Sequence, residues 1–482
     1  MAQKLKFVLS DLHIGAGQAT AAGVPDQAFA ATQQFIDFLH TIKDESERDN
    51  REIELIINGD MFAFLQVPAV DNFDPKIVYP ASAFHDSSQE ASVKRLNIIV
   101  QRNTAIFDAL SDFIHVENPQ RRITIIKGNH DISLFWPGVK TRLRELLGAS
   151  GARASLLRFA DEFVSREQIY VEHGHQRAEK MNGYQDSFDP RAATNPTQLH
   201  YPAGSRFTID FLNGAKSRWW FVDHIKPATA LIWYALHWNF DFACDALVSF
   251  IRHTPSLVVN DLELGSQTLV ANPKLLRELE SREQRDQLAR NYAASPAFRR
   301  EFHRLVQQYL GDATIDNKGE AAFRFVDISD DPLEMGQADQ QRQRAMLNHA
   351  AQLVAAQERA KVILFGHSHF PVFETLPNGC TYINTGSWTR DLSNAAPETW
   401  RALFSGTLAP ADVPPTLPYA RIEYDDHGTP SARLLTFNGP SNSNTETTGN
   451  DRVAKKRTGS KSFLIRTFPR ISRLLGASDH PS

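Results

Sequence analysis

The segment at positions 361–370 reads KVILFGHSHF, an apolar run that ends in a glycine and then in two histidines separated by one serine. A buried strand can end in any polar loop residues, so two imidazoles at such a place need a cause. Other runs in the chain end in a similar way. Each is short, rich in β-branched residues and stopped by a glycine or a polar cluster, which is typical of strands covered on both faces. These runs lie at 4–11, 53–60, 122–131, 168–175 and 361–369.

Helical patterns separate the early runs. An apolar face recurs from Phe29 to Ile42, with Pro25 suited to the first helical position, and another extends from Leu96 to Phe113. A shorter amphipathic stretch lies at 135–148. Because strands alternate with helices, the sequence predicts an α/β fold with a layered core.

The pattern changes after the fourth run. A Trp-rich stretch at 217–250 and charged helical patterns such as 273–294 predict a mostly helical insertion. Alternation around Asp426-His427-Gly428 predicts a hairpin near the end of the fold, and the Ser-, Asn- and Thr-rich remainder predicts a disordered tail. We therefore expect a core at 1–175 and 361–437, a helical insertion or cap at 176–360, and a disordered basic tail at 438–482.

The composition limits the class of protein. The chain has 482 residues, of which 42% are hydrophobic and 22% charged, as in soluble globular proteins, and its net charge of −4 gives no overall basic field for nucleic acid. Only two cysteines, Cys244 and Cys380, argue against a disulfide framework and fit a reducing compartment. The N-terminal apolar stretch is too short for a secretory signal, and the stretch at 228–236 is too short to span a membrane. We expect a cytoplasmic protein.

Every one of the five apolar runs ends in a residue type that binds divalent metal. In open α/β folds ligands collect outside the carboxyl ends of the strands, so these side chains are expected to meet at one edge. A mixture of carboxylate, amide oxygen and imidazole suits Mn²⁺, Fe or Zn²⁺, whereas the cysteine count excludes an all-thiolate zinc site. The residues are Asp11, His13, Asp60, Asn129, His130, His173, His367 and His369.

The order of these motifs resembles that of the calcineurin-like metallophosphoesterases. Any one motif is weak alone, but five in this order are highly specific. The resemblance covers 1–175 and 361–437, and it implies a layered β-sandwich flanked by helices. The motifs are Asp11-Leu12-His13, Gly59-Asp60, Gly128-Asn129-His130-Asp131, His173-Gly174 and Gly366-His367-Ser368-His369.

The resemblance implies a dinuclear metal centre that hydrolyses phosphoester or pyrophosphate bonds. Two cations, Mn²⁺ in preference to Fe or Zn²⁺, would polarise the phosphoryl oxygens and convert a bridging water to hydroxide for in-line attack. His130 would protonate the leaving oxygen, and Asp131 would orient the His130 imidazole. One cation would be held by Asp11, His13, Asp60 and His369, and the second by Asp60, Asn129, His173 and His367.

The sequence departs from the family pattern at two motifs. Ala63 stands where the family often has a carboxylate, which we expect to tune the site without abolishing it. The fourth motif continues to His175, where bacterial UDP-2,3-diacylglucosamine pyrophosphatases usually carry aspartate, and those enzymes tend to have arginine in place of His130. Length and helical insertion are similar to theirs, but these differences leave the substrate open. His175 fits either a supporting role at the site or a loop residue.

Three segments allow two interpretations each. The tryptophans at 219, 220, 233 and 238 favour the core of a helical cap over an apolar wall above the metal centre. The segment 384–388 resembles a turn that follows the histidine pair in relatives, although a plain tight turn is favoured. The basic tail at 452–475 is either solvated or a reversible contact with an anionic membrane on its inner face.

We therefore expect a metal-dependent hydrolase whose substrate is a phosphorylated small molecule or a lipid-linked phosphate compound. The alternatives are a nuclease of the same family and a catalytically inactive binding scaffold. Confinement of the basic cluster to the tail weighs against nucleic acid as a partner.

Overall fold

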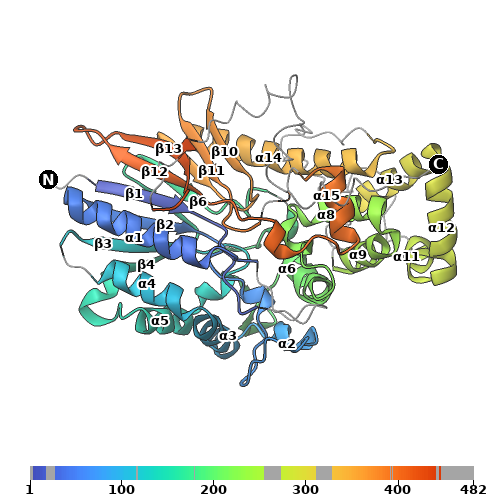
Figure 1. Cartoon of the computed structure of the whole chain (residues 1–482), viewed down its shortest axis with the longest axis horizontal. Helices are drawn as coiled ribbons and strands as arrows, with labels where there is room; N and C mark the ends of the chain where they lie inside the picture. Colours follow the sequence, from blue (N-terminus) through green and yellow to red (C-terminus); the bar gives the residue numbers. More distant parts are fainter. Residues whose placement is uncertain are drawn as a thin grey trace, which may run out of the picture.

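The apolar runs of the sequence form the central strands of two β-sheets that pack face to face (Figure 1). The computed structural model describes residues 4–17, 28–115, 118–178, 180–253, 273–310, 328–390, 392, 395–440 and 445–446. The predicted tail segment at 452–475 and the proline at 25 lie outside these residues.

The larger sheet has seven strands, with a parallel centre and an antiparallel edge. They are β1 (Lys4–Leu9), β2 (Glu52–Asn58), β3 (Arg121–Ile126), β4 (Leu157–Ala160), β12 (Pro418–Tyr424), β13 (Pro430–Thr436) and β14 (Thr445–Glu446). Their order in the sheet is β14-β13-β12-β1-β2-β3-β4, and β1 to β4 are parallel to one another. The strand β14 lies within the segment that the sequence analysis gave to the tail.

The smaller sheet has five strands in the order β10-β11-β9-β6-β5. Its central strands β6, β9 and β11 are parallel, so β6 and β9 end at the same edge. A separate pair, β7 (Arg191–Ala192) and β8 (Asn195–Leu199), lies outside both sheets. The five strands are β5 (Phe163–Arg166), β6 (Ile169–Glu172), β9 (Val362–Phe365), β10 (Pro371–Thr375) and β11 (Thr381–Thr385).

Apolar side chains fill three layers. Between the sheets, Val8 and Ile56 of the larger sheet are buried in one cluster with Leu364 of the smaller sheet. The outer face of the larger sheet is covered by α1 (Thr32–Asp49), α3 (Gln89–Arg102), α4 (Thr104–Ile114) and α5 (Pro137–Leu146). The outer face of the smaller sheet packs on the second half of α14 (Pro332–Gln357). The predicted α/β fold, a β-sandwich flanked by helices, is therefore confirmed.

A helical region lies beside one end of the sandwich, and the long helix α14 runs from this region onto the smaller sheet (Figure 1). Trp233 is fully buried at its centre, and Trp219, Trp220 and Trp238 pack around the same cluster. The tryptophans are thus core residues. The helices are α6 (Ala203–Phe207), α7 (Asn213–Lys216), α8 (Ala228–Trp238), α9 (Phe240–His253), α11 (Pro273–Glu280), α12 (Arg282–Ala294), α13 (Pro296–Leu310) and α15 (Pro397–Phe404).

Two helix boundaries differ from the sequence prediction. The first helix begins at Thr32, and Phe29 lies before it in an isolated bridge with Thr389. The apolar face from Leu96 to Phe113 belongs to two helices, because the chain breaks at Asn103. The side-chain amide of Asn103 donates to the carbonyl of Gly15 at 2.7 Å, an alternative to helical hydrogen bonding that asparagine readily adopts.

A hydrogen bond to a buried ion pair connects the core to the helical region. The ammonium of Lys216 lies 2.7 Å from Asp223 Oδ2, and Gln66 donates to the same oxygen at 2.9 Å. Gln66 belongs to the loop that follows β2, so the helical region is attached close to the carboxyl ends of the strands. Among the described residues, no helix combines the length and apolar character needed to cross a membrane.

We expect replacement of Trp388 by alanine to destabilise the fold strongly. Its ring is fully buried, lies edge-on to Phe35 and Phe38, and donates to the Pro418 carbonyl at 2.7 Å. The cavity and the lost hydrogen bond should together reduce the free energy of unfolding by about 3–5 kcal/mol in urea denaturation. Phe188→Ala, at an exposed aromatic residue, is the control and should change it by less than about 0.5 kcal/mol. Equal effects of the two substitutions would contradict this assignment.

Candidate metal centre

Five loops at one end of the sandwich bring the predicted metal-binding residues together. They follow β1, β2, β3, β6 and β9, at the carboxyl ends of parallel strands. The seven predicted ligands and His130 are each at most 6% exposed. Three groups whose ligand atoms all lie within 4.8 Å of one another overlap here: Asp11, His13 and His369; His13, Asp60 and His130; and Asp11, Asp60 and His173.

The backbone at this site is strained. Eight non-glycine residues among those described have a positive φ, and five of them belong to the cluster, with φ between 49° and 68°. Each left-handed non-glycine residue costs on the order of 1–3 kcal/mol and persists only where the surroundings enforce it. The strain therefore indicates a site where the positions of the side chains are maintained at the cost of an unfavourable backbone conformation. The five residues are Asp11, His13, Asp60, His367 and His369.

The first two loops hold each other in this conformation. The N–H of Asp11 donates to the Gly59 carbonyl at 3.1 Å, and the N–H of His13 donates to the Asp60 carbonyl at 2.9 Å. The hydrogen bonds between β1 and β2 thus continue beyond the ends of both strands. This pairing enforces the left-handed residues at the point where each loop leaves the sheet.

Each carboxylate has one anchored oxygen and one oxygen that faces the cluster. The N–H of His367 donates to Asp11 Oδ2 at 3.0 Å, and the N–H of His130 donates to Asp60 Oδ1 at 2.8 Å. Asp11 Oδ1 is buried without a hydrogen-bond partner among the described residues and lies 3.2 Å from His369 Nε2. Asp60 Oδ2 lies 3.3 Å from His173 Nε2. This arrangement fixes each carboxylate and leaves one oxygen for a cation.

The imidazole of His173 is oriented in the same manner. Its Nδ1 lies 2.9 Å from the carbonyl oxygen of Asn58, which accepts only if Nδ1 carries the proton. The lone pair of Nε2 then faces Asp60 and the amide oxygen of Asn129, 3.3 Å away. A histidine that donates one ring N–H to a carbonyl and turns the other nitrogen to a metal is a common ligand arrangement. His367 Nδ1 lies 3.1 Å from the same Asn129 oxygen.

The two remaining histidines meet near Asp11. The Nε2 atoms of His13 and His369 are 3.0 Å apart, and both lie within 3.8 Å of Asp11 Oδ1. Two imidazoles and one carboxylate that converge in this way supply part of the coordination shell of a cation. The structure therefore places His13 and His369 on one side of the cluster and Asn129, His173 and His367 on the other, with Asp11 and Asp60 between them.

The electrostatics favour a positive charge in the cluster. Burial lowers the pKa of His13 and His369, so these imidazoles remain neutral and keep a lone pair available. Burial also acts to lower the pKa of His173, but the carboxylates of Asp60 and Asp11 raise it to about 10. The two buried carboxylates thus favour a positive charge beside them. Divalent cations would supply it and displace the proton.

The carboxylate of Asp131 accepts hydrogen bonds from two backbone amides. Its Oδ1 accepts from the N–H of Gly128 at 2.5 Å, and its Oδ2 accepts from the N–H of Met61 at 2.9 Å. No hydrogen bond joins it to the ring of His130, whose Nδ1 has no partner among the described residues. The predicted orientation of His130 by Asp131 therefore has no direct hydrogen bond behind it among the described residues and stays a prediction. Because both carboxylate oxygens are used by backbone amides, Asp131 joins the loops after β2 and β3 and acts as a positioning residue.

Two glycines are required by close approach. A Cβ atom at Gly59, where φ is 78°, would overlap the ring of His173. A Cβ atom at Gly128 would overlap the carboxylate of Asp60. These glycines precede or neighbour the ligands in the motifs because the loops pack against one another without room for side chains.

The segment 384–388, interpreted from the sequence as a plain tight turn, supports the site. The amide of Asn384 donates to the Gly366 carbonyl at 2.7 Å, and the N–H of Trp388 donates to the Asp11 carbonyl at 3.2 Å. Ser10 is attached to this segment too, through Thr385 at 2.7 Å. The loops that carry Asp11 and the histidine pair are therefore held by this turn.

The remaining motif positions fall beside the cluster. Ala63 is fully buried and donates its N–H to the Ile14 carbonyl at 3.0 Å, so its backbone joins the loops after β1 and β2. His175 is 3% exposed, its ring centroid lies 5.4 Å from that of His173, and neither ring nitrogen has a partner among the described residues. His175 thus lies near the second side of the cluster without contacting either carboxylate.

Sequence reasoning missed the contribution of the helical region. A cavity of about 30 Å³ beside the cluster is lined on one side by Asp60, Asn129 and His130 and on the other by Lys226. Lys226 is half-buried. Burial lowers the pKa of His130, and the positive charge of Lys226 lowers it further. No local sequence pattern identifies Lys226 as a site residue, because a lysine followed by a proline and an apolar helix is typical of an ordinary helix start. Only the packing of the helical region onto the loops reveals its position.

The donor set fits divalent metal. Two carboxylate oxygens, one amide oxygen and four imidazoles suit Mn²⁺, Fe or Zn²⁺, and the second oxygen of each anchored carboxylate and the oriented His173 are arranged as ligands. Asp11 lies within 4.0 Å of imidazoles on both sides of the cluster, so two neighbouring cations could share its free oxygen or that of Asp60.

Comparison with known proteins adds little to this geometry. No protein-family model matches the chain, and no curated protein matches it significantly. Among the solved structures that match is a dimetal phosphatase from Danio rerio, which is 10% identical, with 93% of this chain and 100% of that chain covered and a TM-score of 0.29. A similarity this low carries no conclusion about this chain.

We expect Asp60→Asn to abolish metal binding while the loops stay in place. Asparagine retains an oxygen to accept from the His130 N–H, but it removes a charge that two of the three ligand groups share. After equilibration with Mn²⁺ and desalting, elemental analysis should find two Mn²⁺ per wild-type chain and less than one in the variant. Asp108→Asn, on the exposed face of α4, is the matched control and should bind as the wild type does. Full Mn²⁺ content in Asp60→Asn would contradict the assignment.

Proposed function

We propose that this chain is a metal-dependent hydrolase of phosphoester or pyrophosphate bonds with a dinuclear centre, as its resemblance to the calcineurin-like metallophosphoesterases implies. One observation carries the proposal: two buried carboxylates, each anchored through one oxygen, face four histidines and one asparagine at the carboxyl ends of parallel strands. When bound, two divalent cations would polarise the phosphoryl group and activate water.

The chain's own residues would fix and complete the reaction geometry. Asp11, His13, Asp60 and His369 would hold one cation, and Asp60, Asn129, His173 and His367 the other. His130 lies against His13, with ring centroids 4.7 Å apart, and its free Nδ1 is able to bond a substrate oxygen. We assign it the transfer of a proton to the leaving oxygen, a role that requires the negative charge of a bound phosphoryl group to raise its lowered pKa.

The cavity supports a small phosphorylated substrate. Its volume of about 30 Å³ leaves room beside the ligands for little more than a phosphoryl group's oxygens or a few waters. The tryptophans of the helical region, which could have formed an apolar wall for a lipid chain, are packed into its core. A soluble phosphoester or pyrophosphate is therefore favoured over an acyl-bearing substrate.

The two alternatives to this function fit less well. A nuclease that follows a strand needs a series of cations along the phosphate backbone, and Lys226 is the single lysine or arginine among the described residues that line the cavity. A scaffold without metal would gain nothing from five left-handed non-glycine residues at one site.

The direct test is a substrate panel on the Mn²⁺-loaded protein. It should include phosphomonoesters, phosphodiesters, nucleotide sugars with and without acyl chains, and single-stranded nucleic acid. Metal-dependent turnover of a small phosphoester or pyrophosphate is expected. Absence of turnover across the panel by the metal-loaded protein would overturn the proposal.

We expect His130→Asn to separate catalysis from metal binding. The substitution removes a proton donor, and kcat should fall by about a hundredfold or more while Mn²⁺ content stays at the wild-type value. If Mn²⁺ is lost as well, His130 is a ligand, in line with its grouping with His13 and Asp60, and the assigned role as a proton donor is wrong.

We expect Lys226→Met to weaken substrate binding. A charge-assisted hydrogen bond from its ammonium to a phosphate oxygen is worth about 1.5–3 kcal/mol, so KM should rise by about tenfold or more with kcat less affected. Lys226→Arg should restore part of the affinity. Lys94→Met, at an exposed lysine on α3, is the control. An unchanged KM in Lys226→Met would show that the substrate does not reach this side of the cavity.

A further inference from the structure

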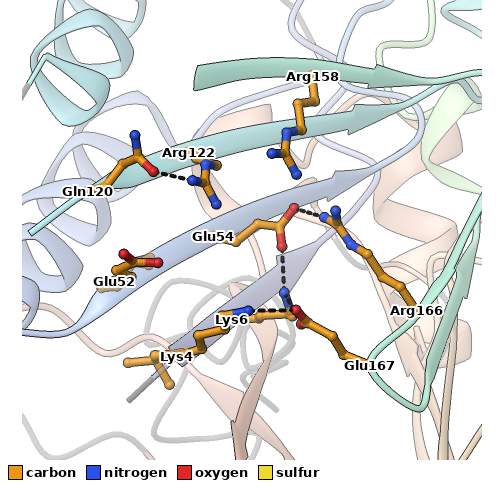
Figure 2. A pocket seen from close by; sticks show the side chains of 11 residues that line it. Lys4, Lys6, Glu52, Glu54, Gln120, Arg122, Arg158, Arg166 and Glu167 are labelled. Atoms are coloured by element: carbon orange, nitrogen blue, oxygen red, sulfur yellow. Dashed lines mark hydrogen bonds and ion pairs between the residues drawn. The ribbon is translucent and has the colours of Figure 1, made fainter. Parts of the chain in front are cut away.

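A second polar pocket lies at the opposite end of the larger sheet, where the parallel strands begin (Figure 2). It has a volume of about 230 Å³ and contains side chains from both sheets. This is smaller than the pockets that hold drug-sized ligands, which start at about 300 Å³. Five cationic side chains and three carboxylates line it, so its net charge is positive: Lys4, Lys6, Arg122, Arg158 and Arg166, with Glu52, Glu54 and Glu167.

The register of the sheet places the charged residues on one face. Lys6 pairs with Glu54, Glu54 with Arg122, and Thr124 with Arg158. Residues that pair across a sheet, and residues two positions apart in one strand, point to the same face. The side chains of Arg122 and Arg158 are therefore diagonal neighbours on β3 and β4. Figure 2 shows their guanidinium groups projecting into the same space above Glu54.

The carboxylates are used mainly by other cations. Lys6 lies 2.5 Å from Glu54 and 2.8 Å from Glu167, and Arg166 donates to Glu54. Lys4 donates to Glu167 at 3.0 Å. This network closes the end of the layer between the sheets. Arg122 of β3 and Arg158 of β4 are not part of it.

Among the described residues, the two arginines have no anionic partner in a hydrogen bond or ion pair. The only acceptor found for Arg122 is the side-chain amide of Gln120, and its Nε is buried without a partner among the described residues. The same residues provide no hydrogen bond or ion pair to the guanidinium of Arg158. Arg166 also has a buried Nε without a partner there. Like charges side by side, with buried donors unused, are unfavourable unless an anion lies between them.

We propose that this pocket binds a small phosphate-type oxyanion through the guanidinium groups of Arg122 and Arg158, with Arg166 at its edge. Planar guanidinium groups bond tetrahedral oxyanions in pairs of parallel hydrogen bonds, and such an anion would satisfy the unused donors and separate the two positive charges. The pocket shares no lining residue with the cavity at the metal centre. The proposal therefore does not depend on the proposed hydrolytic function.

The test is calorimetric titration of the full chain, stripped of divalent metal by a chelator, at ionic strength held constant with chloride. Inorganic phosphate, pyrophosphate and glycerol 3-phosphate are the probes. Saturable binding by the wild type is expected. Arg158→Gln should weaken the affinity by about tenfold or more, because one of the two guanidinium groups that bond the anion is lost. Tighter binding of glycerol 3-phosphate would identify a phosphorylated metabolite as the ligand, and tighter binding of inorganic phosphate would identify the free anion.

The variants include their own controls. Arg158→Gln removes no hydrogen bond or ion pair that the described residues make, so it should fold as the wild type does, which thermal unfolding can verify. Arg158→Lys keeps the positive charge but cannot form two parallel hydrogen bonds. Its affinity for the anion should therefore lie between those of the wild type and Arg158→Gln. Arg433→Gln, at an exposed arginine on β13, should leave binding unchanged. Any anion bound at the metal centre is common to all these proteins. No saturable binding by the wild type, or equal affinity in Arg158→Gln, would overturn the proposal.

Discussion

The site depends on two hydrogen bonds from backbone amides to carboxylates. The N–H of His367 holds Asp11 and the N–H of His130 holds Asp60, so each aspartate is fixed by a loop from another strand. These contacts cross from one sheet to the other and from one parallel strand to its neighbour. They leave one oxygen of each carboxylate facing the imidazoles, and the left-handed backbone of the loops is the cost of that position.

The two ends of the larger sheet have opposite electrostatic character. At the carboxyl ends, buried carboxylates and neutral imidazoles create a demand for cations, and the helical region adds Lys226 on the side where an anionic substrate would approach. At the amino ends, Arg122 and Arg158, which have no anionic partner in the described part of the chain, favour the binding of an anion. The charged and polar residues lie at the two ends of the same strands. The apolar residues in the middle of these strands fill the layer between the sheets.

Much of the fold could be predicted from the sequence, since buried parallel strands are continuous apolar runs and the residues after them have distinctive chemistry. The strands at 52–58 and 362–365 and the convergence of the loops follow from that pattern. Other features depend on contacts that no local pattern encodes. The carboxylate of Asp131 bonds backbone amides, which have no sequence signature, so its role could not be distinguished from that of a partner for His130. Asn103 breaks a helix because Gly15 lies beside it, and Lys226 reaches the site through packing between distant segments.

The central claim is that these loops bind two cations at one rim of the sandwich. Anomalous diffraction from crystals of the Mn²⁺-loaded protein tests it most directly. The account requires two anomalous peaks, one among Asp11, His13 and His369 and the other among Asp60, Asn129 and His173. Peaks elsewhere on the chain, or none in a fully Mn²⁺-loaded crystal, would contradict it.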